Sequence, residues 1–229
     1  MGYARPMGIL DGYRKNWPRV GALLGMGIAG ATALASKKLT KPQMLSALNF
    51  AALTVHQYEE YEDPGYFPGQ FNAGVLHSDV PDRYPLNTNT AMIVNVPLAY
   101  TFYALPVVFP KHRTLGLAPV LFGFMQAVGH GTAFPKLAGD RYSPGFLASL
   151  LLHVPIGVLY LRAVHDEEPL KRPDIAKAMA LNFAFAVTSI AGPNLALKDK
   201  SSPYRFTAKQ MGPHLPQALD TGAGVGLGA

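Results

Sequence analysis

Five long, almost uncharged apolar segments constrain the fold of this chain more than any other feature. Each has about 18–21 residues, and about 20 residues at 1.5 Å rise cross a hydrocarbon core of about 30 Å. Buried β-strands rarely exceed about 10 residues, so the lengths favour helices. We therefore predict an all-α, polytopic transmembrane helical bundle, with spans at residues 42–59, 91–109, 114–134, 145–164 and 174–192.

A sixth segment, residues 20–35, is shorter and rich in glycine. Three interpretations are open. Basic residues before it and Ala33-Leu34-Ala35 at its end resemble a secretory signal peptide. Gly21 and Gly25 form a pair of small residues four apart, which favours a closely packed membrane helix. A re-entrant or interfacial segment is the third interpretation. The expected number of spanning helices is thus five or six.

The chain divides into three parts on this basis. Residues 1–40 form an N-terminal segment with the short glycine-rich helix, and residues 41–195 form the membrane bundle. Residues 196–229 are expected to be a flexible C-terminal tail, because they are rich in proline and glycine. The long connection over residues 62–90 mixes prolines, glycines and aromatic residues. Since it follows an acidic motif, we expect it to cover a site there.

Charge and cysteine content exclude several classes of function. Only 15% of the residues are charged, and the net charge of +6 comes from basic residues that lie mostly between the apolar segments. No basic element or nucleic-acid-binding motif is present, so we expect anionic lipid headgroups, not nucleic acid, as the partner. The chain has no cysteine, which excludes thiolate zinc sites and iron–sulfur clusters.

Three ionisable residues close the first of the five apolar segments. His56, Glu59 and Glu60 are spaced i, i+3 and i+4, so they share one sector of a helix. One imidazole and two carboxylates on one face can bind a divalent metal, zinc or iron. A second histidine, His130, lies between two glycines in a later segment. Ionisable groups inside a membrane are costly, which points to function.

Further polar residues lie inside the apolar segments. Lipid offers them no partners, so they should face inward together and form a polar chamber. The alternative is that they are structural, forming hydrogen bonds between helices. This set comprises Asn49, Asn95, Gln126, His153 and Asn182.

These motifs resemble those of the HXXEE family of bacterial integral membrane proteins. The resemblance rests on His56-x-x-Glu59-Glu60, on His130, and on Tyr142-Ser143-Pro144-Gly145, in that order. It implies a multi-pass protein of the bacterial inner or plasma membrane. The family has no established activity and is regarded as a possible metal-using enzyme family.

Four hypotheses for function follow. In the first, zinc is bound by His56, His130 and one of the two carboxylates, Glu59 or Glu60. The other carboxylate, for example Glu60, would then be the base, and Tyr142 a proton donor. In the second, iron is held by both carboxylates and the histidines. Under either of these two hypotheses the protein is an enzyme, with zinc or with iron, that acts on a lipid-like or hydrophobic substrate. The alternatives are a small transporter and a non-catalytic accessory subunit, either of which could oligomerise or pair with another membrane protein.

Overall fold

The computed structural model describes residues 9–215, and this part of the chain is helical without strands. The all-α prediction is therefore confirmed. Several consecutive elements join end to end into longer helices. The elements are α1 (Ile9–Leu34), α2 (Lys41–Tyr61), α3 (Phe67–Gly69), η1 (Gln70–Val75), α4 (Thr88–Ile93), η2 (Val94–Leu98), α5 (Ala99–Val108), α6 (Arg113–Val128), η3 (Gly129–Ala133), α7 (Phe134–Ala138), α8 (Phe146–Ala148), η4 (Ser149–His153), α9 (Val154–Glu167), α10 (Arg172–Phe185), η5 (Ala186–Ala191), α11 (Gly192–Ala196), α12 (Ala208–Met211) and η6 (Gly212–His214).

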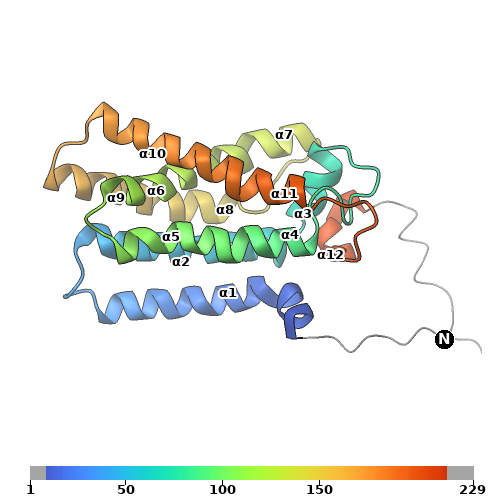
Figure 1. The fold of residues 1–229 in the computed structure, drawn as a ribbon, viewed down its shortest axis with the longest axis horizontal. Coiled ribbons are helices and arrows are strands. Elements are labelled where there is room, and N and C mark those ends of the chain that lie inside the picture. The colour runs from blue at the N-terminus through green and yellow to red at the C-terminus, as the bar shows by residue number, and fades with distance from the viewer. Residues whose placement is uncertain (1–8, 216–229) are drawn as a thin grey trace, which may run out of the picture.

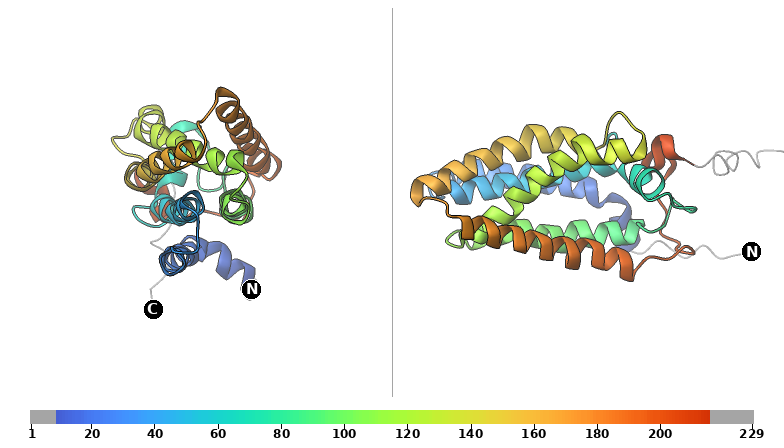
Figure 2. Two further views of the ribbon diagram at one scale, coloured as in Figure 1. Left: turned by 90° about the vertical axis from the view of Figure 1, so that its left-hand side faces the viewer. Right: turned by 90° about the horizontal axis from the view of Figure 1, so that it is seen from above.

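Six long helices run back and forth between the same two ends of the bundle (Figures 1 and 2). They are α1, α2, α4–α5, α6–α7, α8–α9 and α10–α11. The turns after α1, α5 and α9 lie at one end, and α3, α12 and the start of α1 lie at the other (Figure 1). We call the second of these the cap end. This arrangement brings the C-terminal turns of α2 to the cap end.

Three of these helices are long and apolar enough to cross a membrane: Thr88–Val108, Phe146–Glu167 and Arg172–Ala196. The distribution of side chains agrees with a membrane protein, because apolar residues face outward. On α10, Asn182 is 2% exposed whereas its neighbour Phe183 is 72% exposed. Helix α2 carries buried polar residues, including His56 and Glu60, and these lower its average hydropathy. Length and hydropathy alone therefore do not give the number of spans.

Prolines coincide with wide turns inside the long helices. The elements η2, η3, η4 and η5 are π-helical, and in η4 the N–H of Val154 bonds the carbonyl of Ser149 five residues back. Pro97 lies inside η2, and Pro135, Pro155 and Pro193 follow the other three within two residues. Proline provides no N–H, so a widened turn next to it lets neighbouring carbonyls find other donors. Such turns often occur at functional sites, and here they contain His130 and Ser149.

Helix α1 begins at Ile9, well before the predicted residue 20, and packs along α2 (Figure 1). Gly21 and Gly25 are both buried. A Cβ at Gly25 would lie 1.9 Å from Thr54 Oγ1 and 3.3 Å from the carbonyl of Ala51, both on α2. The small residues thus allow the close backbone approach that their spacing predicted.

The expectation of a flexible C-terminal tail is wrong for residues 196–215. Phe206 and Met211 are buried in a cluster with Trp17 and Tyr61. The N–H of Phe206 also bonds the carbonyl of Asp82 at 2.7 Å. Burial of these two large apolar side chains offsets the entropy of ordering the segment. The remainder of the predicted tail, residues 216–229, lies outside the described residues.

Candidate metal centre

The last two turns of α2 carry the first part of the candidate site. Thr40 caps the helix by accepting the N–H of Gln43, and Pro42 occupies its first turn. His56 and Glu60, one turn apart, both point into the bundle and are 1% and 5% exposed. The sequence spacing therefore places an imidazole and a carboxylate on the inward face, as predicted.

A second imidazole, His130, meets this pair from η3. His56 Nε2 lies 3.4 Å from Glu60 Oε1, and His130 Nε2 lies 3.3 Å from the same oxygen. The three ligand atoms all lie within 4.8 Å of one another. Bonds of about 2.1 Å at tetrahedral angles put neighbouring ligand atoms about 3.4 Å apart. The two distances to Glu60 thus fit the ligand spacing of a small divalent ion.

Two serines orient the two imidazoles. Ser149 Oγ lies 3.0 Å from His56 Nδ1, and Ser143 Oγ lies 2.9 Å from His130 Nδ1. Gln126 Nε2 lies 3.2 Å from His56 Nε2, and because an amide nitrogen only donates, His56 Nε2 is the acceptor and Nδ1 carries the proton. Among the described residues, His130 Nε2 has no hydrogen-bond partner. The Nε2 atom of each ring also faces Glu60 Oε1, so Nε2 is the atom that each imidazole would offer to a metal in place of its present neighbours.

Sequence reasoning did not assign roles to these serines. Ser143 is the variable position of the Tyr-x-Pro-Gly motif, and Ser149 is a polar residue within the apolar span 145–164. A polar residue in an otherwise apolar span was the available signal for Ser149.

Glu59 is held apart from the cluster. Its carboxylate accepts hydrogen bonds from the Tyr142 hydroxyl, from the N–H of Leu147 at 3.1 Å and from the N–H of Ala148 at 2.7 Å. The last two donors belong to the first turn of the helix that starts at Phe146, where a negative charge is favourable. Burial and the bond to Glu59 raise the pKa of the Tyr142 phenol. Tyr142 is therefore protonated near neutrality and donates a hydrogen bond to Glu59. Through its bonds to the N–H groups of Leu147 and Ala148, Glu59 connects α2 to α8.

Gly145 completes the Tyr142–Gly145 motif. Its φ of +104° is a conformation that favours glycine. A Cβ there would lie 2.8 Å from His56 Cε1 and 2.9 Å from His130 Cε1. The motif therefore makes three contributions to the site: Tyr142 binds Glu59, Ser143 binds His130, and Gly145 leaves room for both imidazoles.

The predicted polar chamber exists around this centre. His153 Nδ1 lies 2.7 Å from Asn49 Oδ1, and its ring centroid lies 5.7 Å from that of His56. Asn95 accepts a hydrogen bond from Gln57 at 3.2 Å. Asn182 is buried, but its amide has no hydrogen-bond partner among the described residues. His153 and Asn95 thus lie close to the cluster, whereas no hydrogen bond in the described part of the chain links Asn182 to it.

An apolar cavity of about 210 Å³ opens beside the three ligands. Aromatic residues of the 62–90 connection line it, and the Phe67 and His130 ring centroids are 4.9 Å apart. The connection therefore covers the site, as predicted. The polar groups of its lining include Asn95, Gln126 and Asn194, and Glu60 is its only carboxylate.

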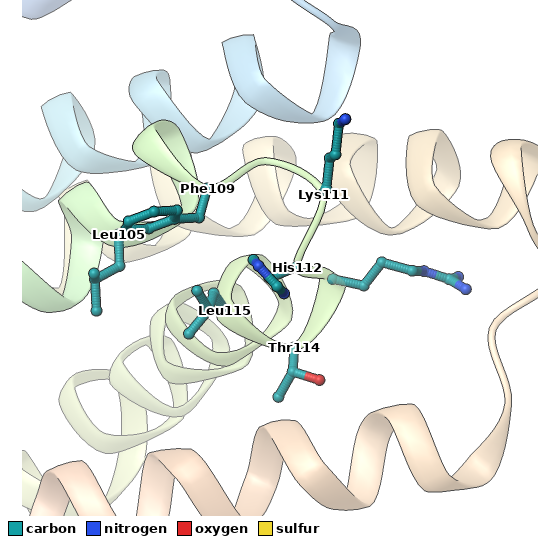
Figure 3. A pocket seen from close by; sticks show the side chains of 7 residues that line it. Leu105, Phe109, Lys111, His112, Thr114 and Leu115 are labelled. Atoms are coloured by element: carbon teal, nitrogen blue, oxygen red, sulfur yellow. The ribbon is translucent and has the colours of Figure 1, made fainter.

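A larger and more open hollow, of about 640 Å³, lies at the turn between α5 and α6, at the other end of the bundle (Figure 3). His112 and Thr114 line it together with Lys111 and Arg113. It has no carboxylate and no second histidine. Its lining therefore lacks the ligand set that the smaller cavity has.

Comparison with known proteins agrees with the motifs. The model of a family described as a protein of unknown function with HXXEE motif matches residues 47–160. The chain belongs to the HXXEE family. Every residue of the candidate centre, from His56 to Ser149, lies in the matched part of this HXXEE protein, whereas α1, α10 and α12 lie outside it. No curated protein and no solved structure matches the chain.

Proposed function

We propose that this HXXEE protein is a metal-dependent membrane enzyme in which His56, Glu60 and His130 bind one zinc or iron(II) ion. The observation that carries the proposal is the convergence of two imidazole Nε2 atoms on one oxygen of Glu60, at 3.4 and 3.3 Å. Two histidines and one carboxylate with open positions are ligands of both catalytic zinc and non-haem iron(II).

The surroundings of the three ligands support a catalytic centre over a structural one. A structural zinc site is closed by four protein ligands, whereas here the described residues supply three. The ion would supply a Lewis acid and an activated water next to the cavity. Ser143 and Ser149 orient the imidazoles through their Nδ1 atoms, and the 62–90 connection covers the site.

The apolar lining supports a hydrophobic, lipid-like substrate. The cavity is bordered by η2, α6 and η5, and its wall is mostly apolar and aromatic. Gln126 and Asn95 are polar residues of this wall, and they can orient an ester, amide or hydroxyl group. In this proposal Glu60 is a ligand, and Glu59 with Tyr142 is a structural pair, not the catalytic base.

A membrane location with six spans belongs to the same proposal. The six long helices share both ends (Figure 1), and α1 and α2 are as long as the three helices with high hydropathy. The polar residues that lower the hydropathy of α2 face the interior, so they do not oppose insertion of the bundle.

Metal analysis of the purified full-length protein in detergent tests the proposal. We expect about one zinc or iron per chain, and loss of the ion in His130→Ala. His112→Ala is the matched control, because His112 is exposed and lies at the other end of the bundle. A wild-type protein that contains no metal and takes up neither zinc nor iron(II) on titration contradicts the proposal, and the accessory-subunit hypothesis then replaces it.

The class of reaction is tested with the metal-loaded protein and a membrane lipid extract, followed by mass spectrometry. Hydrolysis consumes one water and splits a lipid into two products, whereas mono-oxygenation adds one oxygen atom from O2 and reduces the other to water with two electrons, so O2 and an electron donor are supplied in the assay. We expect one of these changes with wild type and neither with His130→Ala.

A further inference from the structure

A basic pocket of about 240 Å³ lies at the cap end, between the first turns of α1, the end of α2 and the segment before α12. Its lining contains one acidic residue, Glu62, and Trp17. Its five cationic residues are Arg14, Lys15, Arg19, Arg205 and Lys209. We call these residues the basic pocket.

The acidic residues nearby do not neutralise this pocket. Arg19 Nε binds Glu62 Oε2 at 2.9 Å, Arg14 pairs with Asp11, and Arg205 lies 3.5 Å from Asp82. Among the described residues, the lining holds five cations and one acid, and counting Asp11 and Asp82 as well gives five cations against three acids. The side chains of Arg19 and Arg205 are 63% and 51% exposed. The pocket therefore presents accessible positive charge to an anion.

Its position along α1 matches the depth of lipid headgroups. Immediately after Arg19, α1 presents outward apolar residues that begin with Val20 and continue with Leu23 and Leu24. The apolar surface that would contact acyl chains therefore starts beside the pocket. Trp17, inside the pocket, is of the residue type enriched at membrane interfaces.

The pocket is held by the ordered part of the C-terminal segment. The guanidinium of Arg14 stacks on the Tyr204 ring at 4.2 Å and binds Asn89 at 3.1 Å. Gln210 donates to the carbonyl of Tyr61 at 3.2 Å. Tyr61 also lines the cavity beside the metal centre. Contacts from three parts of the chain thus fix the pocket next to the candidate site.

We infer that the basic pocket binds the phosphate group of an anionic phospholipid headgroup. Clustered Arg and Lys side chains at a helix end bind lipid phosphates through charge and hydrogen bonds. The inference goes beyond the proposed enzyme, since it needs membrane insertion but neither metal nor catalysis. All five cations of the basic pocket lie outside the part of the chain that matches the HXXEE family, so the pocket is an addition to the family core.

Quenching of Trp17 tests the inference directly, because it is the only tryptophan of the chain. The full-length protein in neutral detergent is titrated with phosphatidylglycerol that carries a nitroxide near the carboxyl end of its acyl chain. Phosphatidylcholine with the same label is the control lipid. We expect saturable quenching by phosphatidylglycerol, at an apparent dissociation constant at least ten-fold lower than that for phosphatidylcholine.

The variant Arg205→Gln with Lys209→Gln removes two exposed cations from the pocket, and Lys37→Gln with Lys38→Gln removes two at the other end. At roughly five-fold per cation near a membrane surface, we expect about 25-fold weaker binding in the first variant. The second variant should bind as wild type does. Native mass spectrometry of retained lipid gives the same comparison without relying on fluorescence.

Three outcomes overturn the inference. The first is equal quenching by both lipids, and the second is unchanged binding in the Arg205/Lys209 variant with an unchanged melting temperature. The third is inorganic phosphate that displaces phosphatidylglycerol at equal concentration, which would identify a free-phosphate site instead of a lipid site. Metal content is measured in parallel, so that failure of the pocket and failure of the metal centre are separate results.

Discussion

Adjacent glutamates in α2 have different environments. Glu60 Oε1 faces two imidazole nitrogens and the apolar cavity, whereas Glu59 accepts three hydrogen bonds from residues 142–148. One residue along a helix rotates the side chain by about 100°, which is enough to move a carboxylate from the centre to the neighbouring helix. The two acids of the motif thus have different roles: Glu59 is an anchor between helices, and Glu60 is the proposed metal ligand.

Glutamine substitutions separate these two roles while preserving side-chain size. We expect Glu60→Gln to lower metal affinity by more than the 10–100-fold typical of residues that only orient a ligand, with little change in melting temperature of the metal-free protein. Glu59→Gln should retain the metal but lower the free energy of unfolding by about 1–3 kcal/mol, because it weakens charge-assisted hydrogen bonds. Metal titration and thermal unfolding check both. The reverse pattern would make Glu59 the ligand.

At the scale of elements, close helix packing and wide helical turns position the centre. Helix α1 approaches α2 closely at Gly25, and at Gly21 it packs against Tyr100 of α5; α2 in turn carries His56 and Glu60. The π-helical turns η3 and η4 supply His130 and Ser149. A proline follows each of these two turns, so a widened helical turn next to a proline positions both His130 and Ser149.

Gly25 and Gly27 offer a matched test of the α1–α2 contact. A Cβ at Gly25 would meet Thr54 Oγ1 at 1.9 Å, whereas nothing lies within 4 Å of a Cβ at Gly27. We expect Gly25→Ala to lower the free energy of unfolding by about 1–3 kcal/mol through overpacking. Gly27→Ala should be neutral or stabilising by up to about 1 kcal/mol, since alanine favours helix. Thermal unfolding in detergent compares them, and equal effects would show that α1 does not depend on this close approach.

At the scale of the whole molecule, polar groups lie inside and apolar groups outside. Asn49, His56 and His153 are buried, and large apolar residues such as Leu23 and Phe183 are exposed. This pattern suits a bundle surrounded by lipid. The candidate metal centre lies toward the cap end, where the 62–90 connection and the C-terminal segment both pack (Figure 1).

Single cysteines test the six-span topology, because the chain has none of its own. Lys37 and Lys111 lie at one end of the bundle, and Asn16 and Lys198 lie toward the other (Figure 1). We expect cysteines at the first two positions to react with a membrane-impermeant maleimide from one side of the membrane, and cysteines at the other two from the opposite side. Labelling of Asn16→Cys from the same side as Lys37→Cys would show that α1 does not cross.

The sequence by itself determined the helical class, the helix registers and half of the centre. Apolar length and helical periodicity are local properties, so they gave the long helices and placed His56 and Glu60 on one face of α2. The sequence also predicted that the 62–90 connection covers the site, because this connection comes directly after the His56–Glu60 motif.

Only the tertiary structure decided which groups meet across helices. The roles of Ser143 and Ser149, the separation of Glu59 from Glu60, and the packing of Met211 at the cap end depend on contacts between residues far apart in the chain. Residue spacing fixes a direction around one helix axis, but it contains no information on the distance to another helix. The rotation and approach of each helix are set by packing, here by glycines and wide turns, and these decided that His56, Glu60 and His130 meet.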